Sequence, residues 1–252
     1  MPSSHYFCSL ALSRTHLAVL VACCASLSWA QDQSQKVQVS KIEKAELPAG
    51  GTLRLERAAG EIWIEGWDQP KVEITTATFI KDDVPSSHGE EEKRLIENVR
   101  VTVARYGTEL IVRTEYPHHF ALPVVPYPGK GRKLDLEYHI RVPRTAAIAV
   151  DSHAAELHVD DVTGNVTASV GDGLIALRLP SDRLSIDAKS DFGGVDSDFG
   201  GHERRRFWLI GHEFRNRDAG ASQNLHLRVG YGDIVILRIR KPPPPEARVN
   251  EQ

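Results

Sequence analysis

The sequence predicts an all-β fold in which short segments stack as the coils of a single-stranded β-solenoid, with about 20 residues per coil. A phrase recurs along the chain: a glycine or small residue, a spacer, and then apolar residues in alternation. It stands at residues 60–64, 155–159, 173–177 and 232–236, with a degenerate copy at 193–195. Ile175 follows Leu157 by 18 residues, and Val195 follows Ile175 by 20. Ile234 follows Val195 by 39 residues, or two periods, so the spacing predicts coils that stack in the order of the chain.

The second observation is the alternation of apolar and polar residues, which is the pattern of a strand with one buried face. It starts at Val37 and continues to Phe79. Turn-forming residues interrupt it at 48–51, 59–60 and 68–70. This part of the chain is therefore expected to form successive short strands.

One short helix is expected near residues 87–98. Ser87 stands three residues before Glu90, which is the spacing of a capping box, and helix-forming residues follow. Strands resume over residues 99–112. The turn sequence at 106–108 divides them, so this segment predicts a β-hairpin.

The second half of the chain begins with an irregular segment. Residues 117–133 are rich in proline and glycine and predict a surface loop. Residues 134–142 alternate cleanly and predict a long strand that ends at Pro143. The repeats follow, so residues 31–241 are expected to form one β-repeat domain. The proline run that opens residues 242–252 predicts an extended, mobile tail.

The first thirty residues have the features of an export signal. An apolar stretch from Leu17 to Leu27 follows a basic residue, and Ser28-Trp29-Ala30 offers small residues at both recognition positions of a cleavage site. Residues 1–30 are thus expected to be a signal peptide that is removed before Gln31 in a bacterium. An alternative is a lipid anchor, because Leu20–Cys23 resembles a bacterial lipobox in which Cys23 would carry the lipid.

Composition limits the chemistry that the rest of the chain can perform. The three cysteines, Cys8, Cys23 and Cys24, all lie in the leader. The remainder can therefore form no disulfide framework, thiolate nucleophile or cysteine metal site. The formal net charge is −3 with both signs interspersed, which gives no field to attract nucleic acid. No second apolar stretch is long enough to cross a membrane as a helix.

The order of these features carries a resemblance to a known family. The segment Gly60-Glu61-Ile62-Trp63-Ile64-Glu65-Gly66-Trp67-Asp68 is followed by the short helix and hairpin, the strand ending in Arg141-Val142-Pro143, and the glycine-punctuated repeats. Residues 37–240 thereby resemble a bacterial β-repeat family named "putative adhesin" or "toastrack", a domain of unknown function. The resemblance implies a secreted or envelope-associated domain, in some members encoded beside envelope-stress signalling systems. It carries over no catalytic residues, and the charged stretch 198–224 departs from its regular repeat.

Two segments are candidates for ligand binding, each with a structural alternative. Arg204, Arg205 and Arg206 form the only dense basic cluster, and with Trp208 they could contact anionic glycans, lipid headgroups or nucleic acid. The simpler interpretation is a solvated strand edge that discourages pairing with other chains. Trp63 lies between Ile62 and Ile64, so it points away from the core side of its strand. An exposed tryptophan can stack on sugars, although packing under the helix is equally compatible with the sequence.

Other motifs are interpreted as turns. The sequence Gly-His-Glu occurs at 201–203 and again at 211–213, but neither copy continues to a zinc-binding spacing. The sequence Asp-Phe-Gly-Gly occurs at 191–194 and 198–201 without the other kinase motifs. Its glycines are expected to take positive φ, and its phenylalanines to fill the coil interior. No metal site, cofactor or catalytic residue is predicted.

The sequence thus predicts an exported, non-enzymatic protein of the bacterial envelope or periplasm, adhesin-like or structural. Its partner would be an envelope protein or an extended glycan, since stacked coils place like side chains in rows. Two alternatives stay open. A carbohydrate-active β-helix enzyme would require acid and base carboxylates that converge in a groove with Trp63. The other is a component of an envelope-stress sensing system, which would not require such carboxylates.

Overall fold

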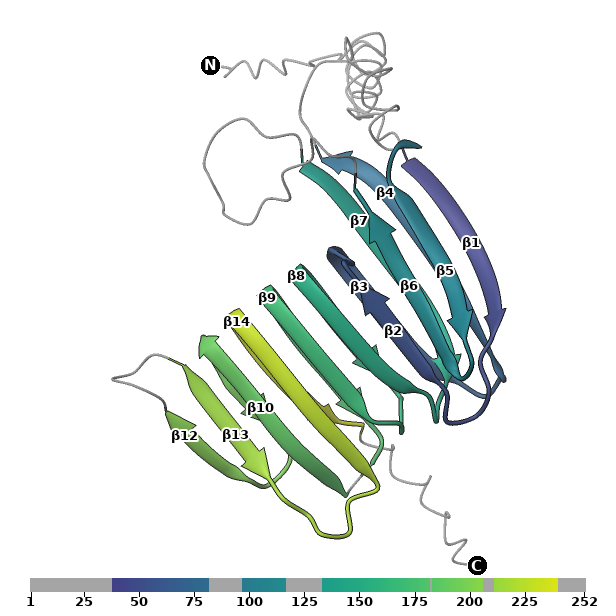
Figure 1. The fold of residues 1–252 in the computed structure, drawn as a ribbon. Helices are drawn as coiled ribbons and strands as arrows, with labels where there is room; N and C mark the ends of the chain where they lie inside the picture. The colour runs from purple at the N-terminus through teal and green to yellow at the C-terminus, as the bar shows by residue number, and fades with distance from the viewer. Residues whose placement is uncertain (1–37, 82–96, 117–132, 182, 206–210, 240–252) are drawn as a thin grey trace, which may run out of the picture. The chain divides into compact units, whose positions relative to one another are not determined.

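The computed structural model confirms an all-β fold, drawn in Figure 1. It describes residues 38–81, 97–116, 133–181, 183–205 and 211–239. Apart from Glu97, which is helical, the regular structure of these residues consists of strands. The strands are β1 (Gln38–Glu46), β2 (Thr52–Glu56), β3 (Gly60–Trp67), β4 (Lys71–Lys81), β5 (Arg100–Tyr106), β6 (Glu109–Glu115), β7 (Lys133–Pro143), β8 (Ala147–Asp160), β9 (Val166–Leu179), β10 (Leu184–Phe192), β11 (Val195–Ser197), β12 (His202–Arg205), β13 (His212–Asn216) and β14 (Gln223–Arg238).

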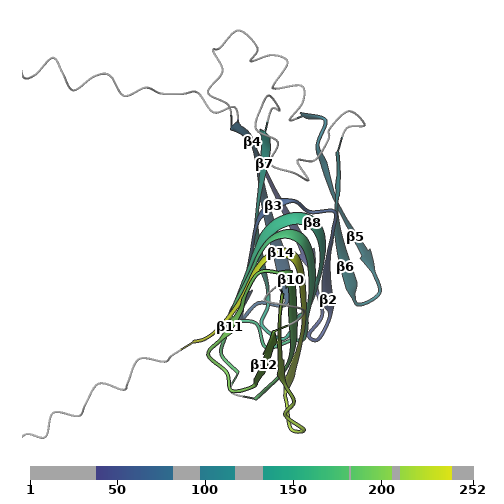
Figure 2. The same ribbon diagram turned by 90° about the vertical axis from the view of Figure 1, so that its left-hand side faces the viewer.

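The longest strands are bent into two arms, with the core between the arms. The first half of β8 pairs with β2 and its second half pairs with β3, so one strand serves two layers. β9 and β14 are bent in the same way and pair with each other along both arms. On the far side of β14, β10 pairs with its first arm and β11 pairs with its second arm. Figure 2 shows these arches from the side.

Equivalent residues of the repeats lie side by side in rows. In one row, Leu157 is in register with Ile175, Ile175 with Ile234, and Ile234 with Val195. All four side chains are buried and belong to one core. A parallel row on the other arm joins Leu53, Ile148, Val166, Leu225 and Ile186. The repeated sequence pattern therefore corresponds to aliphatic side chains that stack on one another in the core.

The order of stacking differs from the prediction. Ile175 was expected beside Val195, but its neighbour is Ile234, because β14 lies between β9 and β10. The 39 residues between Val195 and Ile234 connect direct neighbours and do not span two coils. The charged stretch after residue 198 forms the antiparallel strands β12 and β13 beside β10, after which the chain returns to the middle of the sheet. The sheet is mixed and open, so a regular solenoid of sequential coils is not what forms.

Glycines make the bends between arms possible. Gly173 and Gly232 are in register at this point and have φ of 136° and 130°. A Cβ on Gly232 would collide with the carbonyl oxygen of Gly173, and one on Gly173 with that of Ala155. The glycine of the repeated phrase thus allows both the bend and the close approach of neighbouring backbones.

Several local predictions are confirmed. β5 and β6 form the expected hairpin, with Tyr106 opposite Glu109 and a positive φ at Gly107. β7 is the long strand that ends at Pro143. The predicted helix at 87–98 lies almost wholly outside the described residues, as do the leader 1–30, the loop 117–132 and the tail 242–252. In the described part of the chain, no helix has the length and apolar character needed to span a membrane.

A polar cluster is buried where β6 meets β7. The hydroxyl groups of Tyr138 and Thr114 share a hydrogen bond of 2.7 Å, and both side chains are fully buried. Burial raises the pKa of the Tyr138 hydroxyl well above its ordinary value and that of the neighbouring Tyr116 to about 12. Both tyrosines therefore remain neutral at physiological pH and are structural groups.

Candidate ligand-binding surface

Trp63 is exposed on the outer face of β3, as its position in the alternation predicts. Its side chain keeps 41% of its surface accessible, whereas Ile62 and Ile64 on either side are buried in the core. Tryptophan offers a large ring surface and one N–H donor, so an exposed Trp63 is a candidate for recognition of a ligand.

Neighbouring side chains fix the orientation of the Trp63 ring. The ring stacks on His158 of β8, with centroids 4.1 Å apart and planes 9° from parallel. Its indole N–H donates a hydrogen bond of 2.7 Å to a carboxylate oxygen of Glu61. The stacking contact places one ring face against His158, the hydrogen bond fixes the ring edge at Glu61, and Trp63 also lines a depression on this face of the sheet.

Trp63 belongs to a row of side chains that crosses seven strands and contains no Lys, Arg, Asp or Glu; it is here called the Trp63 row. Adjacent members are direct register partners from β1 through β4, β7, β3, β8 and β9 to β14. The members are Ile42, Thr75, His139, Trp63, His158, Ala176 and Val235. Neighbouring strands lie about 4.8 Å apart, so the row offers regularly spaced contacts along one line.

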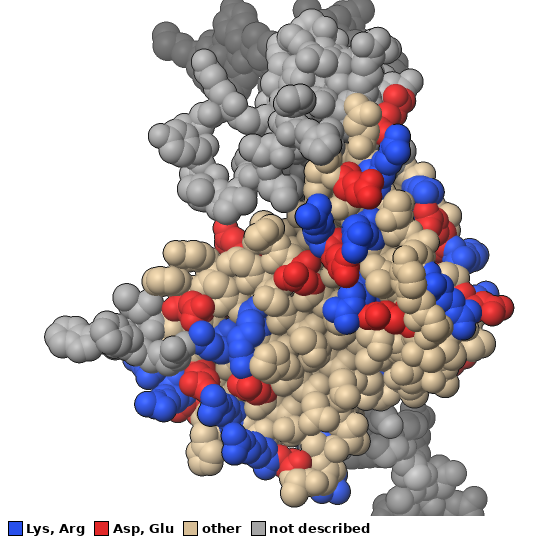
Figure 3. Space-filling view, viewed as in Figure 1, with Lys and Arg blue, Asp and Glu red and all other residues tan. Residues whose placement is uncertain are grey.

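Charged rows flank the Trp63 row on both sides. On one side, Glu61 is in register with Glu137 and Glu156. On the other side, the row contains both acidic and basic groups, in the order Lys44, Glu73, Arg141, Glu65, Asp160 and Arg178. Such groups can donate hydrogen bonds to a polar ligand that lies over the Trp63 row, and can accept hydrogen bonds from it. The face drawn in Figure 3 likewise shows acidic and basic side chains interspersed.

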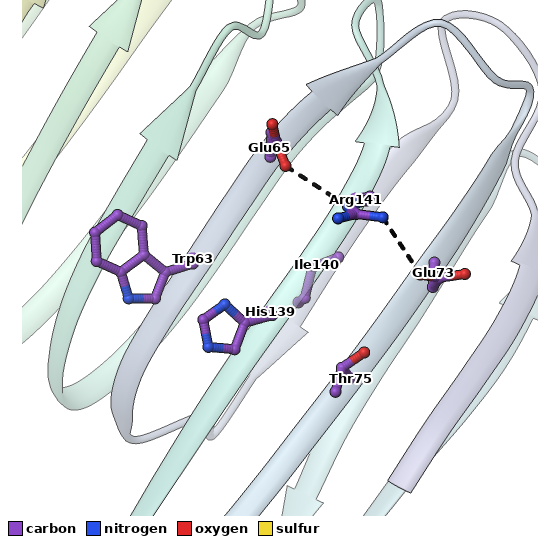
Figure 4. A pocket seen from close by; sticks show the side chains of 7 residues that line it. All are labelled: Trp63, Glu65, Glu73, Thr75, His139, Ile140 and Arg141. Atoms are coloured by element: carbon purple, nitrogen blue, oxygen red, sulfur yellow. Dashed lines mark ion pairs between the residues drawn. The ribbon is translucent and has the colours of Figure 1, made fainter. Parts of the chain in front are cut away.

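A shallow depression of about 130 Å³ lies on this face between Trp63 and the second charged row. Figure 4 shows Glu65 and Glu73 on either side of Arg141, whose guanidinium lies 3.6 Å from the first carboxylate and 3.7 Å from the second. A hydrogen bond from Lys44, helped by the nearby Arg141 charge, lowers the pKa of Glu73. Glu73 is therefore an ionised hydrogen-bond acceptor at neutral pH, a state in which it has no proton to donate.

The predicted arginine cluster is only partly within the described residues. Arg204 and Arg205 are exposed on β12, at one end of the sheet, opposite Glu213 and His212 of β13. Arg206 and Trp208 lie outside the described residues. The two arginines occupy an edge strand far along the strand order from β3, so the structure does not bring them together with Trp63.

The interpretation of the turn motifs is correct only in part. Gly193 has the expected positive φ and Phe199 is buried as predicted, but Gly194, Gly200 and Gly201 do not take positive φ. Phe192, however, does not fill the interior. It is exposed at the bend and stacks on Tyr231 at 4.6 Å, because its register partner also points outward there. In the two Gly-His-Glu segments, the Nδ1 atom of His212 lies 3.4 Å from Glu203, and no group of three metal-binding side chains occurs among the described residues.

Sequence reasoning missed His139, His158 and Arg141 as members of this surface. A signal for His158 was present, because it occupies the same place in its copy of the repeated phrase as Trp63 does in its own. No such signal exists for His139 and Arg141, since β7 pairs with β3 across 75 or more residues of intervening chain.

No family model matches the chain, and no curated protein matches it. The fold is similar to solved bacterial structures. A "putative cell adhesion protein" from Clostridium sporogenes covers 79% of this chain and 100% of its own, at 12% identity and a TM-score of 0.43. A "putative adhesin" from Bacteroides fragilis covers 79% of this chain and 97% of its own, at 12% identity and a TM-score of 0.28. Another from Parabacteroides distasonis covers 81% and 98%, at 9% identity and a TM-score of 0.25. The second and third of these structures are named "putative adhesin", which is also the name of the family that the sequence resembles.

Proposed function

We propose that this chain is an exported, non-enzymatic interaction module of the bacterial cell envelope, and that it binds an extended glycan along the Trp63 row. The observation that carries the proposal is the exposed Trp63 ring, whose orientation is fixed by contacts with His158 and Glu61. A ring held in place before binding loses little conformational freedom when a ligand stacks on it.

The chemistry of the surroundings favours a saccharide over an apolar ligand. A sugar presents an apolar face that can stack on an aromatic ring and hydroxyl groups that need hydrogen-bond partners. The Trp63 row supplies the aromatic ring on which the apolar face can stack. The carboxylates and guanidinium groups beside the row supply hydrogen-bond partners for the hydroxyl groups. The row runs across strands in one line, which suits a linear chain of repeating units.

The same geometry argues against the carbohydrate-active enzyme. A glycoside hydrolase needs one carboxylic acid that stays protonated near neutral pH, which requires a raised pKa. Glu65 and Glu73 do meet Trp63 at the depression, but both face Arg141, and the pKa of Glu73 is lowered. An ionised Glu73 beside Arg141 is suited to accept hydrogen bonds from a ligand and is not suited to act as the general acid.

The proposal is tested by screening the protein on an array of linear polysaccharide fragments and measuring hits by calorimetry. Saturable binding is expected, and Trp63→Ala is expected to weaken it by about tenfold or more. Tyr231→Ala is the matched control, since this aromatic residue is also exposed and stacked but lies outside the Trp63 row. No saturable binding, or equal losses in both variants, would contradict the proposal.

A further inference from the structure

One edge of the sheet is formed by β1, which pairs with β4 on one side only among the described strands. No described strand pairs with the other line of its backbone N–H and C=O groups, and such an edge can pair with a further strand. Ile42, in the middle of β1, is one of the most exposed large apolar side chains, with 62% of its surface accessible. An open edge with an exposed isoleucine is a place where another strand can add.

The sequence of β1 is complementary to itself about Ile42. If two copies of β1 pair antiparallel with Ile42 opposite Ile42, then Lys41 of each copy lies opposite Glu43 of the other. The two residues share one face of the strand and already form an ion pair within it. Two apolar groups would meet at the centre, with an opposite-charge pair on each side.

Other registers are disfavoured by charge. When the two-fold axis is perpendicular to the sheet, the same face of both copies lies on the same side of the joined sheet. Residues directly opposite each other must then point to that same side, so one copy can slide along the other only by two residues at a time. The neighbouring shift in one direction puts Glu43 opposite Glu43. The neighbouring shift in the other puts Lys41 opposite Lys41. Like charges directly opposite each other destabilise a strand pair, so the register about Ile42 is selected.

We propose that two copies of this chain associate through β1, in an antiparallel pair centred on Ile42. The partner is a second copy because the charge pattern is self-complementary, which a strand of unrelated sequence would match only by chance. Most edge strands carry lysines that repel a further strand. In β1 the residues on either side of Ile42 carry opposite signs, and their charges attract an identical strand in this register.

The dimer would also extend the binding surface. Ile42 is the end member of the Trp63 row, and the two-fold axis keeps both rows on the same face of the joined sheets. The two rows then form one line with Ile42 of each copy at its centre. Association does not depend on glycan binding, so either proposal can fail without the other.

A charge-reversal experiment tests the association. The full chain is examined by size exclusion with light scattering over a range of concentrations, with a dimer expected at high concentration, since one strand pair buries less than a standard interface. Lys41→Glu should give a monomer, because the introduced carboxylate faces Glu43 of the second copy. Combining it with Glu43→Lys should restore the dimer. Arg204→Glu, on the edge strand β12, should leave the dimer unchanged.

Cross-linking tests the register. In a chain with Cys8, Cys23 and Cys24 replaced by serine, Ile42→Cys should form an intermolecular disulfide under mild oxidation. Directly opposite residues lie about 4.5–5.5 Å apart between Cα atoms, within the range of a disulfide. Ser40→Cys should not, because Ser40 lies opposite Lys44 of the second copy. A monomer at all concentrations would overturn the proposal, as would a dimer that survives Lys41→Glu or is lost with Arg204→Glu.

Discussion

Tyr138 shows how a single polar atom constrains the core. It is the largest fully buried side chain among the described residues, and its hydroxyl is satisfied by Thr114. A buried hydroxyl without a partner loses its hydration and gains nothing in return. The pair therefore contributes less by its own attraction than by the penalty that follows when one member is removed.

We expect Tyr138→Phe to destabilise the protein by about 1–3 kcal/mol, because it leaves the Thr114 hydroxyl buried and unpaired. The double variant Tyr138→Phe with Thr114→Val should recover most of this loss, since both polar groups are then absent. Urea unfolding followed by circular dichroism measures the free energies. Tyr106→Phe, at an exposed tyrosine, is the control and should change little. A double variant as unstable as the single one would show that the hydroxyl pair is not the cause.

At the scale of elements, the bent strands depend on glycines at their bends, where there is no room for a Cβ atom. Glycines recur at the bends because neighbouring carbonyl oxygens occupy the space where a Cβ would stand, in addition to the positive φ. The turn of the β5–β6 hairpin differs, because a Cβ on Gly107 would meet nothing within 4 Å. Conformation alone constrains Gly107, whereas conformation and packing both constrain Gly232.

This difference predicts unequal effects of the same substitution. Gly232→Ala is expected to destabilise the protein by more than about 3 kcal/mol, because β14 must separate from β9 to admit the methyl group. Gly107→Ala should lose only about 1 kcal/mol, the strain of a left-handed conformation. Thermal and urea unfolding of the two variants make the comparison. Equal losses would mean that the close backbone approach is unimportant.

Features that depend on local periodicity could be predicted from the sequence. The exposed side of Trp63 follows from its buried neighbours Ile62 and Ile64, and the hairpin after residue 99 follows from its turn residues. Phe192 could not be predicted, because at a bend the alternation no longer says which way a side chain points. The Trp63 surface was predictable only in part, since Arg141 reaches it through pairing across a long stretch of chain.

At the scale of the whole molecule, the order of strands in the sheet is the feature that could not be predicted from the sequence. The repeat period reports how long each segment is, and it is the same whether segments stack in sequence or not. β14 is the last of the described strands in the sequence, yet it lies between β9 and β10. Among the described strands, β10 and β13 thus join the rest of the sheet through pairing with β14.

This order predicts the outcome of a C-terminal truncation. In a sequential stack, removing the last coil leaves a shorter stack that still folds. Here β14 contributes five buried aliphatic side chains, namely Leu225, Leu227, Val229, Ile234 and Ile236. At about 1.5–3 kcal/mol each, their burial is comparable with the whole stability of a typical domain, about 5–15 kcal/mol.

A chain that ends at Ser222 should therefore lose its cooperative urea transition, and the amide protons of β9 and β10 should exchange rapidly. A chain that ends at Ile239 keeps all described strands and should unfold like the full protein. Survival of a cooperative transition at a similar urea midpoint in the shorter chain would mean that β9 and β10 can do without the strand between them.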